Sequence, residues 1–425
     1  MEESRELSDP IALLIRAEGA GRGSGFFVGK NLIATNIHVV AGATSISAEL
    51  VGTETKFVVE GSTAFDPKND LVILKIAGEG IPLPIGDSDL LQHGDAVQVI
   101  GYPRGKYKVT EGPIHSIRDS DKWIRMKCKT DGGNSGAPVL NGNGEVIAVA
   151  VANADYFTFA VPVTAVKMLL ARMHEIEPLI QWQKREQIRA YVCLREGQNK
   201  HSPNLYPEAI VDLDKAIQLN PNCVYFYQSR GNVRFQLGKL KTDEGNLVEA
   251  QQHYRGTIDD YTKAIKLCPD YVSVYHSRGA AKSILGQFKF DEGKVKEAQN
   301  HYRDAIDDYT KGIELCANLA IVYNNRADTK WHFGKSEDAV GNIEAAKDLY
   351  QAALIDINTA IELDSDVALF YHTRGQIKAA LGDYSAAIEN YEAARKIDPD
   401  YTDVCEDIEL ARKALERVKR GPTED

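Results

Sequence analysis

The second half of the sequence repeats itself at a fixed step, and this constrains the fold more than any other feature. The related pentapeptides YQSRG, YHSRG, YNNRA and YHTRG begin at residues 227, 275, 323 and 371, so each begins 48 residues after the one before it. A unit of this size does not bury its apolar face alone, so neighbouring units must stack to share a core. We therefore expect an array of repeated units from about residue 181 onward.

The last unit is shorter and shows what is repeated. The links NPN, CPD, CAN, DSD and DPD follow successive units, and the interval from DSD at 364–366 to DPD at 398–400 is 34 residues. The segment ALFYHTRGQIKAALGDYSAAIENYEAARKIDPD resembles the tetratricopeptide repeat, a helix–turn–helix unit of that length. The resemblance implies an all-α array of about five hairpins whose concave face binds protein.

The longer units look like the same hairpin with 14 additional residues. KLKTDEGNLVEAQQ and QFKFDEGKVKEAQN contain them. Fourteen residues are close to four helical turns, so the insertion would lengthen the hairpin without rotating its buried face. The DEG tripeptides favour a loop for part of it equally well, and the sequence leaves both alternatives open.

The first 163 residues have a different pattern. Short apolar or alternating runs, such as DLVILKIA and EVIAVAVAN, are separated by Gly, Asn, Asp or Pro, which is typical of an all-β barrel or sandwich. We predict a β domain at 1–175 and a linker with a first degenerate repeat at 176–220. Three 48-residue units and one 34-residue unit would follow at 221–400, and a capping helix with a tail at 401–425.

The charge balance argues against nucleic-acid and membrane partners. The formal net charge is −11, with 17 Lys+Arg against 21 Asp+Glu in residues 1–175 and 33 against 40 in residues 176–425. Neither part offers the basic surface that nucleic acid or anionic lipid requires. No apolar run reaches the roughly 18 residues of a membrane span, and IALLI near the start is too short for a signal-peptide core. The six cysteines form no CxxC pair, so we expect reduced thiols, a cytoplasmic protein and no metal.

The stretch GGNSGAP at 132–138 is the candidate for chemistry. Gly and Asn suit a plain tight turn, because they tolerate positive φ. The alternative is a turn that presents the Ser135 hydroxyl beside backbone N–H groups, as acyl transfer requires. His38 at the end of one apolar strand and Asp70 at the start of another favour this alternative, because a base, an orienting acid and a nucleophile then occur in order. Asp66 lies close to Asp70, and only geometry can separate the two.

Residues 20–170 resemble the trypsin-like peptidases of the chymotrypsin fold, closest to the HtrA-like branch. The matching stretches are GRGSGFFVGKNLIATNIHVVAGA, NDLVILKI, IGDSDLLQHGDAVQVIGYPRG, GGNSGAPVLNGNGEVIAV and FAVPV. The resemblance implies a double β-barrel in which His38 is the general base, Asp70 orients it and Ser135 is the nucleophile. It also implies that the N–H groups of Gly133 and Ser135 form the oxyanion hole. We expect no cofactor.

The resemblance also points to residues for substrate preference. In this fold the residue six before the serine often lies at the base of the S1 pocket, which here is Lys129, and its ammonium group would favour an acidic P1 side chain. The alternative is that Arg125, Lys127 and Lys129 alternate along one solvated strand face. Ala150 and Ala152 would form the facing wall of the pocket.

Four arginines recur in the repeats, each one residue before the small position of the first helix: Arg230, Arg278, Arg326 and Arg374. One hypothesis places them in the concave groove, where a guanidinium would hold acidic side chains or a terminal carboxylate of a peptide. The other pairs them with neighbouring acids of the array, such as Asp259, Asp260, Asp307 and Asp308.

Together these features predict a multidomain intracellular serine endopeptidase, with an N-terminal all-β double barrel and a C-terminal all-α repeat array. Its substrates would be proteins or peptides, and the repeats would recruit the substrate or a regulatory protein partner. Two alternatives remain. One is a catalytically retired barrel on a repeat scaffold, and the other is the proteolytic arm of a signalling or defence cascade that a partner switches on.

Overall fold

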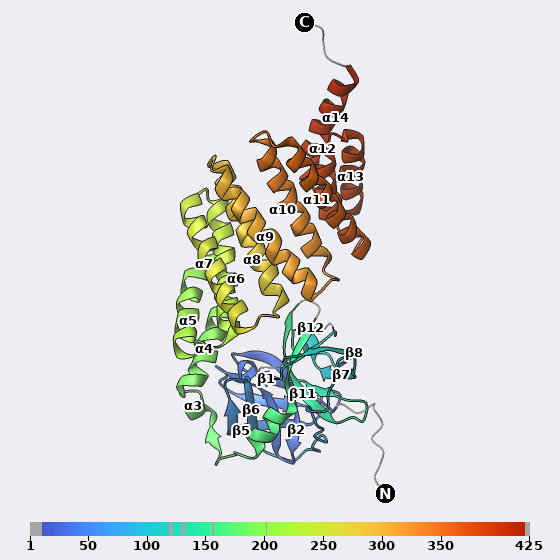
Figure 1. The fold of residues 1–425 in the computed structure, drawn as a ribbon. Helices are drawn as coiled ribbons and strands as arrows, with labels where there is room; N and C mark the ends of the chain where they lie inside the picture. Colours follow the sequence, from blue (N-terminus) through green and yellow to red (C-terminus); the bar gives the residue numbers. More distant parts are fainter. Residues whose placement is uncertain (1–10, 119–121, 129–131, 155–156, 201, 421–425) are drawn as a thin grey trace. The chain divides into compact units, whose positions relative to one another are not determined.

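The computed structural model describes residues 11–118, 122–128, 132–154, 157–200 and 202–420. The chain divides into two compact units, residues 1–229 and 230–425. The first unit contains the β strands, the first helical hairpin and the start of the helix α6 (Val224–Asp243), and the second contains the rest of α6 and the later helices (Figure 1). The hairpin that follows the β strands therefore belongs to their compact unit.

Six strands close the first barrel. β5 pairs with both β4 and β6, so the order β5–β4–β1–β2–β3–β6 returns to β5, and the two-residue β13 (Glu177–Pro178) pairs with β5 as well. β6 pairs on both sides and is buried along almost its whole length, which explains its continuous apolar sequence LVILKI. The strands are β1 (Leu13–Ala17), β2 (Gly21–Gly29), β3 (Leu32–Asn36), β4 (Ile46–Glu49), β5 (Lys56–Asp66) and β6 (Leu71–Ile76).

Six further strands close a second barrel in the order β10–β11–β12–β9–β8–β7. They are β7 (Ala96–Gly101), β8 (Lys108–Ile117), β9 (Ile124–Met126), β10 (Pro138–Leu140), β11 (Val146–Ala154) and β12 (Phe157–Pro162). The helix α2 (Val163–Leu170) follows, and its buried side chains join the core that contains Phe26 of the first barrel. The predicted double β-barrel is confirmed.

From residue 179 onward the described residues are helical apart from the connections between helices, as predicted. Two short helices, α3 (Leu179–Trp182) and α4 (Glu186–Gln198), are followed by α5 (Tyr206–Leu219), α6 (Val224–Asp243), α7 (Leu247–Leu267), α8 (Val272–Asp291), α9 (Val295–Leu315), α10 (Ala320–Asp338), α11 (Ile343–Leu363), α12 (Ala368–Ala380), α13 (Tyr384–Ile397) and α14 (Val404–Arg420). Each helix from α7 to α13 packs on the next one in sequence.

The 14 additional residues of the long repeats divide equally between two helices. α8 and α9 contain 20 and 21 residues, whereas α12 and α13 of the short repeat contain 13 and 14. Each helix is thus seven residues longer, which is close to two turns and keeps its buried face in phase. The DEG glycine forms the tight turn between the helices, with a φ of +74° at Gly293, as Gly382 does in the short repeat with +81°. The insertion lengthens the hairpin, and its DEG part contributes to the turn between the two helices, so each alternative holds for part of it.

The added turns duplicate a glycine–tyrosine contact. In the short repeat the ring of Tyr391 covers Gly375 so closely that a Cβ at the glycine would lie 2.3 Å from it. Gly279 has the corresponding place in α8, and a second contact follows seven residues later, where a Cβ at Gly286 would lie 2.6 Å from the ring of Tyr302. The absence of a side chain at these glycines therefore lets the two helices of a hairpin approach each other.

We expect Gly286→Ala to destabilise the helical unit by about 1–3 kcal/mol, because the new methyl group overlaps the Tyr302 ring. Gly312→Ala in α9 is the matched control. A Cβ at Gly312 would meet its nearest neighbour at 3.8 Å, so the helix propensity of alanine should stabilise by about 0.5–1 kcal/mol. Urea unfolding followed by circular dichroism at 222 nm compares the two. Equal shifts of the two midpoints would contradict the packing argument.

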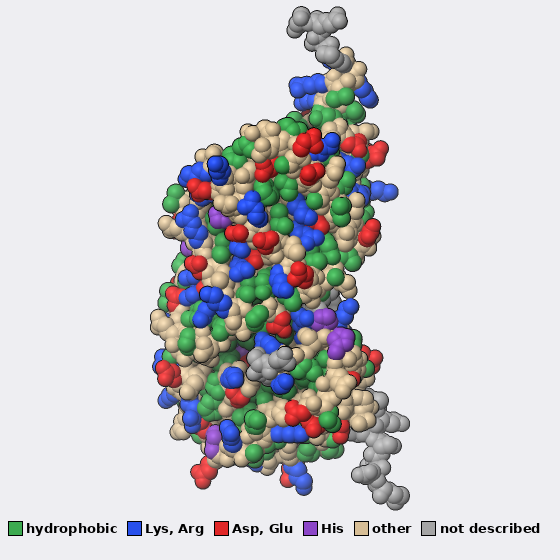
Figure 2. Space-filling model, viewed as in Figure 1, with side chains coloured by type: hydrophobic (Ala, Val, Ile, Leu, Met, Phe, Trp, Pro, Cys, Tyr) green, Lys and Arg blue, Asp and Glu red, His purple; other side chains and the backbone are tan. Residues whose placement is uncertain are grey.

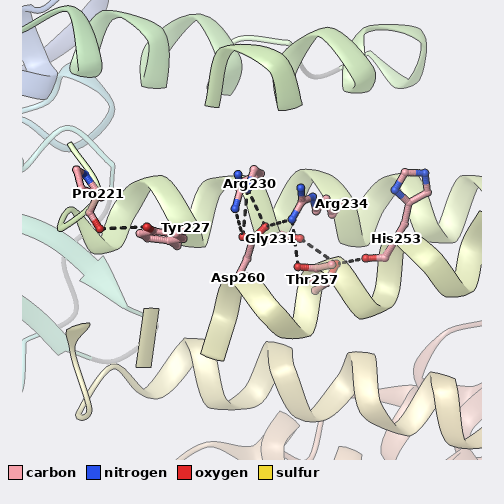
Figure 3. A network of polar contacts seen from close by, with 9 residues as sticks. Pro221, Tyr227, Arg230, Gly231, Arg234, His253, Thr257 and Asp260 are labelled. Carbon is pink, nitrogen blue, oxygen red and sulfur yellow. Dashed lines mark hydrogen bonds and ion pairs between the residues drawn. The ribbon is translucent and has the colours of Figure 1, made fainter. Parts of the chain in front are cut away.

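Buried ion triads connect the helices within the long repeats. Arg230 donates through Nε and Nη2 to Asp260, with a shortest distance of 2.5 Å, and Arg234 donates to the same carboxylate at 2.8 Å (Figure 3). Asp260 is only 2% exposed. Burial raises the pKa of its carboxyl group, and the two guanidinium groups oppose that rise. A buried carboxylate that is held by two cations fixes the register of its helices, since loss of either partner leaves a buried charge uncompensated.

The other repeats use their arginines in the same way. The pairs are Arg278–Asp308 at 2.5 Å, Arg326–Asp356 at 2.6 Å and, with an amide in place of the acid, Arg374–Asn390 at 2.6 Å. The second hypothesis for these arginines is therefore the one that the structure supports. These pairings leave the guanidinium groups partly exposed, and the groove hypothesis stays a prediction.

On the face shown in Figure 2, Lys and Arg side chains are interspersed with Asp and Glu side chains. Within the ranges that the structure describes, no helix is long and apolar enough to cross a membrane.

Candidate active site

His38 and Asp70 lie together at one edge of the first barrel. His38 is in the short helix α1 (Ile37–Val40) directly after β3, and Asp70 directly precedes β6, which pairs with β3. Nδ1 of His38 faces Oδ2 of Asp70, and the backbone N–H of His38 donates to Oδ1 at 2.9 Å. An ionised carboxylate only accepts hydrogen bonds, so this pairing places the ring proton on Nδ1 and leaves Nε2 as the basic nitrogen. Asp70 is 2% exposed, whereas the His38 side chain is 27% exposed.

The backbone of Asp70 is held in an uncommon conformation. Its φ is +57°, which few residues other than glycine adopt and which asparagine and aspartate tolerate best. Its carbonyl oxygen accepts from the backbone N–H of Ile37 and from Nδ2 of Asn36, both at 3.0 Å. These bonds join the turn of the acid to the residues directly before the histidine. Asn36, which no sequence motif singles out, is thus part of the site.

Asp66 has a different task from Asp70. Its Oδ1 accepts from the backbone N–H groups of Lys68 and Asn69, and its Oδ2 accepts from the side-chain amide of Asn69 at 2.6 Å. Asp66 therefore caps the turn that leads to Asp70. The geometry separates the two acids and gives the position beside the imidazole to Asp70.

Ser135 lies in a turn that Ser24 of β2 holds in place. The backbone N–H of Ser24 donates to the carbonyl of Ser135 at 2.8 Å, and its hydroxyl donates to the carbonyl of Gly133 at 2.8 Å. The same hydroxyl accepts from the backbone N–H of Tyr102 at 3.0 Å. One side chain thus connects β2, the serine turn and the segment after β7. Ser24 lies within a stretch that matches the peptidases, but its place in that stretch does not indicate this task.

Two glycines of the serine turn are required by their surroundings. Gly133 has a φ of +110°, and a Cβ there would lie 2.6 Å from the carbonyl oxygen of Tyr102. Gly136 has a φ of +84°, and a Cβ there would lie 2.1 Å from the carbonyl oxygen of Ser24. GGNSGAP is therefore a tight turn and also a turn that presents a serine, so its two interpretations are compatible.

The serine turn and the histidine helix approach the same residue of β2. A Cβ at Gly23 would lie 2.7 Å from the side chain of Val39 and 3.0 Å from the carbonyl oxygen of Ser135. The hydroxyl of Ser135 donates to the carbonyl of Val151 at 3.0 Å, and across the described part of the chain no hydrogen bond joins it to His38. The hydroxyl proton must therefore leave Val151 before His38 can take it.

Donors for a negatively charged oxygen are available beside Ser135. Among the residues that the structure describes, the N–H groups of Gly133 and Ser135 donate to no acceptor of the chain. Backbone N–H groups in a fixed turn stabilise the oxyanion of an acyl-transfer intermediate. The two groups that the resemblance proposes for the oxyanion hole thus have no backbone acceptor among the described residues.

We expect Ser24→Ala to destabilise the β unit by about 1–3 kcal/mol, because the carbonyl of Gly133 and the N–H of Tyr102 both lose their partner. The variant should also slow the reaction of Ser135 with a fluorophosphonate, since the turn with both oxyanion donors is released. The measurements are thermal unfolding and the rate of probe labelling. An unchanged labelling rate would show that the turn keeps its shape without this clamp.

The predicted pocket residues are only partly described. Lys129 lies outside the described residues, and Ala152 is placed by its backbone, opposite Phe159 in β12. Ala150 is buried, and its N–H and carbonyl groups bond to Ala137 and Gly136 at 2.9 and 2.8 Å, so its backbone supports the serine turn. The S1 pocket stays a prediction.

The alternative to the pocket, in which Arg125, Lys127 and Lys129 alternate along one solvated strand face, is wrong for Arg125. Lys127 is exposed, but Arg125 is only 6% exposed. A face that contains a buried arginine is not a solvated face.

The described residues offer no evident metal site. No group of three or more His, Cys, Asp or Glu side chains among them is arranged to hold an ion. Four cysteines, Cys128, Cys223, Cys268 and Cys316, are buried. Burial raises the pKa of Cys128 to about 11, which suppresses the reactive thiolate and fits a packing role.

Comparison with known families gives two matches. The family model described as trypsin-like peptidase domain matches residues 23–149, and the tetratricopeptide repeat model matches residues 368–401. The first match spans β2 to β11, which includes His38, Asp70 and Ser135, and the second spans α12 and α13.

Individual relatives resemble the β unit. The probable periplasmic serine endoprotease DegP-like of Chlamydia trachomatis is 39% identical over 143 residues, which are 31% of this chain and 28% of the relative. The putative serine protease HhoB of Synechocystis is 37% identical over 161 residues, 34% of this chain and 38% of the relative. The chain thus covers well under half the length of these relatives. Among solved structures, the active form of the Rv3671c protease from M. tuberculosis matches 40% of this chain and 84% of its own, with 23% identity and a TM-score of 0.37.

Proposed function

We propose that this chain, which contains a trypsin-like peptidase domain at residues 23–149 and a tetratricopeptide repeat at 368–401, is a serine endopeptidase that cleaves protein substrates. Ser135 is the nucleophile, His38 the general base and Asp70 the residue that orients His38. The repeat array recruits the substrate or a regulatory protein.

The observation that carries this proposal is the pairing of His38 with Asp70 beside the turn of Ser135. The three residues are far apart in sequence, yet Val39, which follows His38 in α1, and the serine turn both approach Gly23 of β2. Names of the relatives, DegP-like endoprotease and HhoB serine protease, support the same class of reaction.

The geometry supports the following reaction. Oγ of Ser135 attacks the carbonyl carbon of the scissile peptide bond, and Nε2 of His38 takes the hydroxyl proton. The N–H groups of Gly133 and Ser135 stabilise the negative charge on the carbonyl oxygen. His38 then returns the proton to the leaving amine, which breaks the C–N bond and leaves an acyl ester on Ser135. Water, deprotonated by His38, hydrolyses that ester and restores the serine.

The Ser135–Val151 hydrogen bond favours a resting conformation that substrate or partner binding converts. The hydroxyl has one proton, and in this conformation it is directed to a backbone carbonyl. Binding that breaks this contact would free the hydroxyl for His38. Such a resting conformation favours the alternative in which the chain is the proteolytic arm of a cascade and a partner switches it on. The cytoplasmic location stays a prediction, and the DegP-like relative is periplasmic by its name.

A fluorophosphonate probe tests the proposed function. The folded wild-type protein should take up one phosphonyl group, and mass spectrometry of the tryptic peptides should place it on Ser135. The retired-scaffold alternative predicts no adduct, both for the protein alone and in the presence of a protein that binds the repeats.

A further inference from the structure

Residues of the helical segment that follows the barrels lie against the turn before Asp70 and against the end of α1 and the loop after it. These residues, directly after α3 and in α4, are in the compact unit of the barrels. The match to the peptidase family ends at residue 149 and does not include them. Their contacts with the two loops identify a component of the site that lies outside the peptidase match.

On the acid side, the contact is made by Tyr191 of α4. Its hydroxyl donates to the carbonyl of Pro67 at 2.8 Å, in the turn between Asp66 and Asp70. The ring is 1% exposed and lies edge-on to Phe226 in the first turn of α6, with 5.5 Å between ring centroids. A buried hydroxyl with a backbone acceptor is fixed in place, because its loss leaves an unpaired buried carbonyl.

The pKa shifts of Tyr191 and of the nearby Cys223 agree with a buried position of the Tyr191 hydroxyl close to Asp70. Burial raises the pKa of Tyr191 well above its ordinary value, and the charge of Asp70 adds to the rise. Burial also raises the pKa of Cys223 to about 12, again with a contribution from Asp70. Tyr191 therefore stays protonated, and its hydroxyl remains a donor over the whole working range of a protease.

On the histidine side, two polar contacts come from the same helical segment. Nε2 of Gln183 donates to the carbonyl of Ala43 at 2.7 Å, and Nη2 of Arg195 lies 3.5 Å from the carbonyl of Val39. The side chain of Val192 would lie 3.7 Å from a Cβ at Gly42. The loop after His38 is thus covered by α4 and by the residue that follows α3.

We infer that Tyr191 is a positioning residue, which holds the turn of Asp70 through the Pro67 carbonyl and so keeps the carboxylate in line with the His38 imidazole. The inference rests on the proposed function and deepens it. Asp70 comes three residues after Pro67 and has a strained φ, so its carboxylate direction depends on the turn. The first helical hairpin is then a working component of the peptidase and not only the first unit of the repeat array.

Tyr191→Phe tests this inference, with Tyr275→Phe as the matched control. Tyr275 is also buried, and its hydroxyl donates to a proline carbonyl, that of Pro269, at 2.9 Å, but it lies in the other compact unit. Tyr191→Phe should lower the maximal rate of Ser135 phosphonylation about 5- to 30-fold, with the probe concentration for half-maximal rate unchanged within about twofold. Tyr275→Phe should leave both values within about twofold of wild type.

Hydrogen–deuterium exchange provides a second measurement that needs no activity. The amides of Ile37 and His38 bond to the carbonyl and carboxylate of Asp70, so their exchange reports the position of the acid. These two amides should exchange at least about fivefold faster in Tyr191→Phe than in the wild type, and at the wild-type rate in Tyr275→Phe.

Unchanged exchange at these amides in Tyr191→Phe overturns the inference, and so does equal slowing of phosphonylation in both variants. If the wild type takes no probe, the proposed function fails, and the exchange of the two amides still decides the role of Tyr191.

Discussion

Ser135→Ala should abolish fluorophosphonate labelling and lower the rate of peptide-bond hydrolysis by roughly 10⁴- to 10⁶-fold. The substitution removes the only hydroxyl in the serine turn, so no acyl ester can form. The fold should survive, because the one side-chain hydrogen bond that is lost, to the Val151 carbonyl, contributes about 1 kcal/mol. Hydrolysis of fluorescein-labelled casein and thermal unfolding measure the two effects.

Ser88→Ala is the control for this prediction. Its hydroxyl makes a side-chain contact of similar length, 2.9 Å to the hydroxyl of Thr164, away from the candidate site. It should keep hydrolysis within about twofold of wild type and lose a similar amount of stability. Residual hydrolysis at the wild-type level in Ser135→Ala would show that the measured activity comes from another serine or another protein.

The inactive variant also gives access to the substrate. Ser135→Ala keeps the backbone donors at positions 133 and 135 and the repeat array, so it should bind a substrate without cleaving it. Proteins retained by this variant but not by the wild type can then be sequenced at the termini that the active protein produces. Acidic residues at P1 would support the prediction for Lys129.

The candidate site residues could be chosen from the sequence because each one lies at a strand end or a turn that a short stretch of sequence indicates. His38, Asp70 and Ser135 stand where an apolar strand ends, where another begins and in a glycine turn, and the structure has the strand ends and the turn at these positions. Their catalytic roles stay predictions. The clamp by Ser24 could not be predicted, since it joins residues that are 109 positions apart. Tyr191 and Pro67 are 124 positions apart and likewise leave no local pattern.

The repeats show a similar division. The fixed step predicted the hairpins, but it set only the total length of the insertion, and only the structure shows that seven residues enter each helix. The partner of each arginine depends on which face of the next helix it meets. The sequence did not distinguish Asp259 from Asp260 as the partner of Arg230. In the structure Asp260 is buried and accepts a hydrogen bond from Arg230.

Asp70→Asn should lower the maximal rate of hydrolysis by roughly 10⁴-fold while the fold is retained. The amide introduced by this substitution would keep its oxygen for the backbone N–H of His38 and would turn its NH₂ group toward Nδ1. An NH₂ group only donates, so Nδ1 must accept and the ring proton moves to Nε2. An imidazole with a protonated Nε2 cannot take the proton of Ser135, so the loss appears in the rate of the chemical step and not in substrate binding.

Asp66→Asn is the matched control, because it makes the same chemical change four residues earlier. The bond from the Asn69 side-chain amide to Oδ2 is lost, but Oδ1 can still accept from the N–H groups of Lys68 and Asn69, so the turn persists and the rate should fall by less than about tenfold. The maximal rate and the Michaelis constant for labelled casein distinguish the two variants, with far-ultraviolet circular dichroism as the test of folding. A 10⁴-fold loss in Asp66→Asn with near-normal turnover in Asp70→Asn would exchange the tasks of the two acids. The hydrogen bonds of each carboxylate argue against that exchange, since only Asp70 contacts the imidazole.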